Sequence, residues 1–241
     1  MNQARWLTLP QREWLRSEGL IQLLERAGQD YARVWNSCED PRWMVEMAAA
    51  SGAEVGAVMN AVGRVCVDAW NHWTAGATDQ RPIQILNAVS RWLRADSDAG
   101  FEDIWSTWEL AEQVAREARE WHGTQQGAVL ATAILNAVEG VHAFTTTARN
   151  LAEPEPGHDQ HDPDRYRRKN EAESSRGLLH DAAEAVHRAA KAGSWWHSHS
   201  EPGASDRDHD AYANQILGFV IRQHLPAEQV IQGLRDRKPP G

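Results

Sequence analysis

The stretch from Gly127 to Thr147 reads GAVLATAILNAVEGVHAFTTT, and Glu139 and His142 are its only ionisable residues. A helix that is apolar almost all round has no face suited to water, so it belongs in the middle of a helical bundle. We therefore expect this stretch to form an interior helix around which the other helices assemble.

The centre of this stretch recurs elsewhere in the chain. Ile-Leu-Asn-Ala-Val occurs at 134–138 and 85–89, and the related Val-Met-Asn-Ala-Val occurs at 58–62. The Asn-Ala-Val triplet is expected about 0.1 times by chance, so the repetition indicates internal duplication. The uneven spacing favours a duplicated bundle over a regular solenoid. Each copy places an amide in an apolar stretch, where a partly buried amide needs a hydrogen-bond partner; these amides belong to Asn60, Asn87 and Asn136.

The rest of the chain shows apolar residues three and four positions apart, which is the period of a one-faced helix. Asp40 before Pro41 and Ser205 three residues before Asp208 predict helix starts. We expect an all-α multi-helix bundle of about nine or ten helices. The chain would consist of an N-terminal bundle (1–152), a loop or weak boundary (153–164) and C-terminal helices packed on the same core (165–241). Within the C-terminal part, we expect a second irregular stretch from Gly193 to Ser205.

Composition excludes some classes of partner. The net charge of -9 over 241 residues disfavours binding to nucleic acid and would steer a basic protein toward the chain. No stretch offers about 18 uninterrupted apolar residues, so no membrane span is expected. Cys38 and Cys66 have no metal-ligand spacing, and the sequence predicts free thiols in a reducing cytoplasm.

Two Glu-x-x-His segments are candidates for metal chemistry. Glu139 with His142, and Glu184 with His187, each place a carboxylate and an imidazole on one helix face, as ferritin-like bundles do to hold iron or manganese. The alternative is that neither segment binds a metal ion: Glu139 and His142 would then be a hydrogen-bonded pair in the core, and Glu184 and His187 a solvated pair. Loop residues with zinc-ligand chemistry form another set: His158, Asp159, His161, Asp162, His197, His199, Asp206, Asp208, His209 and Asp210. No cofactor is our first expectation, with iron, manganese or zinc as the alternative.

The chain carries 12 tryptophans, which is high for its length. Most fall on apolar faces or at helix ends and are predicted to be core residues: Trp70, Trp73, Trp92, Trp105, Trp108 and Trp121. Trp195 and Trp196 differ because they stand together in a predicted polar loop beside His197 and His199. Exposed tryptophan commonly anchors an interface, so these four residues are the predicted partner-binding site.

Signatures of catalysis are missing from the sequence. It has no Gly-rich phosphate loop, no nucleophile elbow and no cysteine with an evident partner base. Whether the chain is an enzyme stays open, but a binding module is favoured. The rival hypothesis is a metal-dependent helical enzyme or metal carrier built on the paired Glu-x-x-His segments.

One resemblance bears on function. Two segments carry this resemblance: Cys38-Glu39-Asp40-Pro41-Arg42-Trp43-Met44, and Arg81-Pro82 followed by Leu86, Ala88, Trp92 and Leu93. Over about residues 38–150 the chain resembles all-helical bacterial immunity proteins of polymorphic toxin systems. The resemblance implies a non-enzymatic binder that neutralises a cognate toxin by covering its active surface. It carries over no individual functional residue.

Overall fold

The computed structural model describes residues 18–28, 30–73, 79–93, 101–120, 125–152, 163–201 and 203–236. Within these ranges the chain forms ten α-helices and no β-strand, which confirms the all-α prediction. The helices are α1 (Glu18–Arg26), α2 (Tyr31–Ser37), α3 (Pro41–Ala50), α4 (Val55–Trp73), α5 (Arg81–Leu93), α6 (Phe101–Glu120), α7 (Gln125–Ala152), α8 (Pro163–Ser200), α9 (Asp206–His224) and α10 (Ala227–Arg235).

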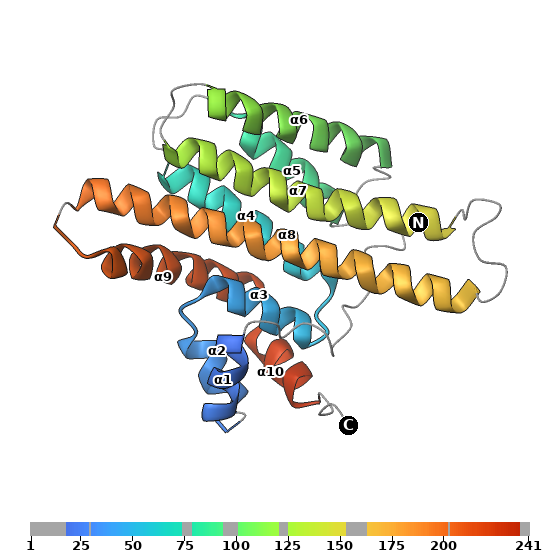
Figure 1. The fold of residues 1–241 in the computed structure, drawn as a ribbon, viewed down its shortest axis with the longest axis horizontal. Helices are drawn as coiled ribbons and strands as arrows, with labels where there is room; N and C mark the ends of the chain where they lie inside the picture. The colour runs from blue at the N-terminus through green and yellow to red at the C-terminus, as the bar shows by residue number, and fades with distance from the viewer. Residues whose placement is uncertain are drawn as a thin grey trace.

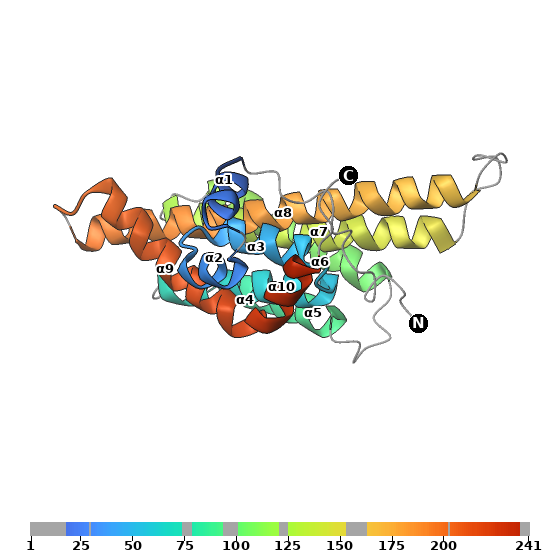
Figure 2. The same cartoon turned by 90° about the horizontal axis from the view of Figure 1, so that it is seen from below.

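The long helices form a layered bundle (Figure 1). Helices α6, α7, α8 and α9 lie side by side in chain order, while α4 packs against α5, α7, α8 and α9. The short helices α1, α2 and α10 gather beside α3 at one side of the bundle (Figure 2). None of the described helices is both long and apolar enough to cross a lipid bilayer.

Helix α7 contains the apolar stretch from Gly127 to Thr147. It packs against α4, α5, α6 and α8, as expected for an interior helix. The other two copies of the Asn-Ala-Val segment lie on α4 (58–62) and α5 (85–89), and α4, α5 and α7 all contact one another. The repeated segments therefore meet in the core, where their apolar side chains are buried: Val58, Met59, Val62, Ile85, Leu86, Val89, Ile134, Leu135 and Val138.

The three repeated asparagines do not share one environment. Asn60 and Asn136 are half-buried, as predicted, whereas Asn87 is exposed. The Asn136 side chain donates to Glu139 Oε2 at 3.4 Å, within its own helix. The three copies therefore share the apolar face around the asparagine, but the asparagine side chain does not have the same role in each copy.

Small residues let α8 approach its neighbours closely. Ala182, Ala185, Ala189 and Ala192 are all buried along one face of α8. A Cβ added at Gly140 of α7 would meet the Leu178 carbonyl oxygen at 3.1 Å. Helix pairs with small residues at the interface bring their backbones close together and exclude water between them.

Helix α8 also corrects one prediction, because the stretch from 193 to 200 is helical and not irregular. Gly193 is a packing residue within the helix, since a Cβ there would overlap the buried indole ring of Trp73. Helix α8 also begins at Pro163, while residues 153–162 of the predicted loop lie outside the described residues.

The predicted helix starts at Asp40 and Ser205 are confirmed. Asp40 accepts a hydrogen bond from the Arg42 amide at 2.9 Å, with Pro41 as the first helical residue. Ser205 and Asp208 form a reciprocal capping box that begins α9. These caps satisfy amide groups that the first turn of a helix leaves without partners.

Candidate functional site

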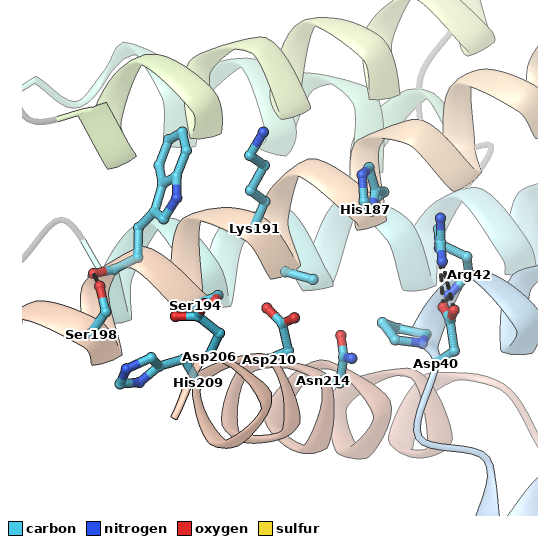
Figure 3. Close-up of a pocket in the computed structure, with 13 residues that line it drawn as sticks. Asp40, Arg42, His187, Lys191, Ser194, Ser198, Asp206, His209, Asp210 and Asn214 are labelled. Carbon is cyan, nitrogen blue, oxygen red and sulfur yellow. Dashed lines mark hydrogen bonds and ion pairs between the residues drawn. The ribbon is translucent and has the colours of Figure 1, made fainter. Parts of the chain in front are cut away.

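A pocket of about 550 Å³ opens between α8, α9 and the start of α3 (Figure 3). Its volume is typical of sites that hold a small molecule or a side chain of a partner. The side chains that line it are mostly polar or charged: Asp40, Pro41, Arg42, His187, Ala190, Lys191, Ser194, Trp195, Ser198, Asp206, His209, Asp210 and Asn214.

Helical spacing explains how these residues meet. The α8 wall runs from His187 to Ser198 at intervals of three and four residues, so its members share one face. On α9, Asp206, Asp210 and Asn214 follow one another at intervals of one turn. The two helices are antiparallel neighbours, so their polar faces line opposite sides of the same pocket.

At the α3 end of the pocket, Arg42 and Asp40 form an ion pair with each other. Arg42 Nη2 lies 2.8 Å from Asp40 Oδ2, and Arg42 Nε lies 3.2 Å from Asp40 Oδ1. This two-pronged bond raises the pKa of Arg42 above its ordinary value. Burial, with the positive charge of Arg42 as a second cause, lowers the pKa of His187, which favours its neutral form at neutral pH.

The far end of the pocket adjoins a cluster of rings that joins α4, α8 and α9. His197 and His209 lie with their Nδ1 atoms 2.8 Å apart, so one ring donates and the other accepts. The His197 ring stacks on Tyr212 at 4.2 Å between ring centroids. Tyr212 Oη lies 3.2 Å from His72 Nε2, which links the hairpin of α8 and α9 to the end of α4.

The four predicted partner-binding residues separate into different environments on α8. Trp196 stacks on Tyr212 and packs against the core, so together with His197 it serves internal packing. Trp195 lines the pocket, with Lys191 Nζ at 5.0 Å from its ring centroid. His199 is exposed, and its Nδ1 lies 2.6 Å from the Trp195 carbonyl oxygen. Of the four, Trp195 and His199 remain available to a partner.

The two Glu-x-x-His segments are not brought together. His142 of α7 packs against α6, stacked on Trp108 at 5.2 Å between centroids. His187 of α8 faces the pocket beside α3, and Glu184 pairs with Arg188 at 2.7 Å. Among the described side chains, no three His, Cys, Asp or Glu residues are grouped as ligands for a metal ion.

Other predicted groups are placed as follows. Asp206, His209 and Asp210 line the pocket from helix α9 and not from a loop, and Asp208 caps that helix. The candidate ligands from 158 to 162 lie outside the described residues.

Both cysteines are buried free thiols, and burial raises the pKa of Cys38 to about 11 and of Cys66 to about 12. A thiol with such a pKa is a weak nucleophile at neutral pH.

The tryptophan predictions are right in the core and wrong at one surface position. Trp70 and Trp73 are buried, and Trp108 is half-buried against the core. Trp105 is 39% exposed and donates to Glu109 Oε1 at 2.8 Å. Trp92 and Trp121 have side chains outside the described set. Trp35, which the periodicity did not single out, is fully buried.

Sequence reasoning missed Arg42, Lys191, Ser194 and Asn214 as parts of a site. Polar residues at intervals of one turn are typical of a solvated helix face, and only the pairing of two such faces shows a pocket. The useful signal was the run of charged residues from Asp206 to Asp210, which the sequence suggested as ligands.

No protein-family model, curated protein or solved structure matches this chain. What the pocket can bind therefore follows from its own side chains. They offer carboxylates on α9, hydroxyl and indole groups on α8, and an ion pair at the start of α3.

Proposed function

We propose that this protein is a non-enzymatic binding module for a basic protein partner, with the face formed by α8 and α9 as its contact surface. The observation that carries the proposal is the polar pocket on that face, which has Asp206 and Asp210 on one side and Trp195 on the other. Tryptophan is enriched at protein interfaces, where it is commonly surrounded by a polar rim.

The charge of the whole chain supports a basic partner. A net charge of -9 attracts a positively charged protein over several ångströms and raises its rate of association. The exposed carboxylates of Asp206 and Asp210 place part of that charge at the pocket itself.

The shape of the hairpin supports the same surface. The C-terminal end of α8 and the N-terminal end of α9 extend past the ends of α4, α6 and α7 in both views (Figures 1 and 2). A projecting edge can enter a concave surface on a partner, and the ring cluster around Tyr212 holds it to the bundle.

The resemblance of residues 38–150 to immunity proteins supports a particular kind of partner, a bacterial toxin. Many toxins that act on nucleic acid are basic, because their substrate is a polyanion. In this proposal the acidic face covers the basic surface of such a toxin and blocks its access to substrate.

The test is reconstitution with a defined partner. The protein encoded beside this gene is produced alone, its toxicity is scored on expression, and its affinity for this chain is measured by calorimetry. We expect a complex with a dissociation constant below about 1 μM and relief of toxicity on co-expression. A neighbouring toxin that binds no more tightly to this chain than to an unrelated acidic protein would overturn the proposal.

A further inference from the structure

The pocket holds two carboxylates that are not neutralised by the chain. Asp206 and Asp210 lie one turn apart on α9, and neither forms an ion pair with another described residue. Figure 3 shows both side chains pointing from α9 toward α8, with Asn214 a further turn along. Two adjacent carboxylates and an amide oxygen thus face the same space.

Neither of the two cations that line the pocket, Arg42 and Lys191, forms an ion pair with Asp206 or Asp210. Arg42 is bound by Asp40 through two of its nitrogens. Lys191 Nζ lies 5.0 Å from the Trp195 ring centroid, and in Figure 3 its side chain extends away from α9. His187 has a lowered pKa because of burial and the nearby charge of Arg42. The lining holds three carboxylates and two permanent cations, so its formal charge is negative.

A metal ion and an organic cation need different arrangements of ligands. A bare metal ion needs ligands gathered within about 2–2.6 Å, and the described side chains form no such group of three. A volume of about 550 Å³ instead suits a cation with several heavy atoms. A guanidinium group is planar and donates two parallel hydrogen bonds to a carboxylate, and its flat face packs well against aromatic rings.

We propose that the pocket between α8 and α9 binds a guanidinium group through Asp210 and Asp206, and that an arginine side chain of the basic partner supplies it. The source of the guanidinium rests on the function proposed above, whereas the chemistry of the pocket does not. Asn214 offers its amide oxygen to the same group, and Ser194 and Trp195 form the opposite wall.

Calorimetric titration of the full chain with N-acetyl-arginine amide tests the pocket without any partner. We expect saturable one-to-one binding, and no binding of N-acetyl-citrulline amide, which has nearly the same shape but no charge. Asp210→Asn should weaken binding of the arginine amide by about tenfold or more, because it removes a charged acceptor.

Asp210 is the better target because Asp206 is the first residue of α9, where a carboxylate also stabilises the helix N-terminus. Asp68→Asn is the matched control, since Asp68 is an exposed residue of α4 that does not line the pocket. It makes the same change in net charge and should leave the affinity unchanged. Equal binding of arginine and citrulline amides, or equal losses in the two variants, would overturn the guanidinium site.

A second arm separates the two sources of the group. Free agmatine and a short peptide with one central arginine are titrated under the same conditions. Binding of the peptide that is lost in Asp210→Asn supports an arginine of a protein partner. Binding of agmatine alone would overturn that source while leaving the site in place. Failure of the toxin test above, with arginine amide still bound, would count only against the proposed function.

Discussion

Gly193 of α8 lies directly against the indole ring of Trp73 of α4, so closely that a Cβ at position 193 would overlap the ring. The ring is 3% exposed and is held between the two helices. Glycine is disfavoured within helices, so its presence in α8 is explained by this contact and not by local conformation.

We expect Gly193→Ala to lower the free energy of unfolding by about 1–3 kcal/mol, because an added methyl group in a packed core forces the ring to move. Gly177→Ala is the matched control on the same helix, since nothing lies within 4 Å of a Cβ there. That control should leave stability unchanged or raise it by up to about 1 kcal/mol. Urea denaturation of both variants measures the difference, and equal effects would contradict the packing role of Gly193.

Arg222 of α9 is expected to stabilise the end of α2. Its Nη2 donates to the Cys38 carbonyl oxygen at 2.6 Å and to the Trp35 carbonyl oxygen at 3.2 Å. Arg222→Met should cost about 1.5–3 kcal/mol, because both bonds have a charged donor. Arg33→Met, at an exposed position of α2, is the control. If thermal melting shows the same loss in both variants, the capping role is wrong.

We expect the burial of His142 to make the free energy of unfolding fall in acid. Burial lowers its pKa in the folded protein, so below about pH 6.5 the unfolded chain takes up a proton that the folded chain resists. The contribution of this residue to stability is therefore present at higher pH and is lost as pH falls. His142→Phe keeps a ring against Trp108 and cannot titrate. Between about pH 6.5 and pH 5 its free energy of unfolding should fall less steeply than that of the unaltered protein, and parallel slopes would refute the prediction.

Substitution of Trp195 should affect binding, whereas substitution of Trp196 should affect stability. Trp196→Ala removes the ring stacked on Tyr212 and is expected to cost about 1–3 kcal/mol of stability. Trp195→Ala removes a pocket side chain that contacts Lys191 and should cost less than about 1 kcal/mol. We expect Trp195→Ala to weaken binding of N-acetyl-arginine amide at nearly unchanged thermal stability. The reverse pattern would place the important ring at Trp196.

Local patterns in the sequence determined the helices. The apolar period predicted the long helices, and Asp40 with Pro41 and Ser205 with Asp208 predicted two starts, because a cap depends only on residues within one turn. The all-round apolar character of α7 predicted its interior position, since a helix with no polar face must be covered by others.

Gly193 shows where local reasoning fails. The sequence predicts an irregular stretch from Gly193 to Ser205, yet α8 continues to Ser200. The helix is stabilised there by packing against α4 and α9, and by rings that come from other parts of the chain, such as Trp73 and Tyr212. Tertiary contacts of this kind override local propensity.

What the sequence alone determined is therefore the class of fold, the interior helix and the acidic character of the chain, because each is a property of neighbouring residues or of their sum. Only the tertiary structure decided the site. Asp40, His187 and Asp210 meet at one pocket although far apart in sequence, and Glu139 with His142 lies apart from it. The faces that two helices turn toward each other depend on how every helix of the bundle packs, and no single segment encodes that arrangement.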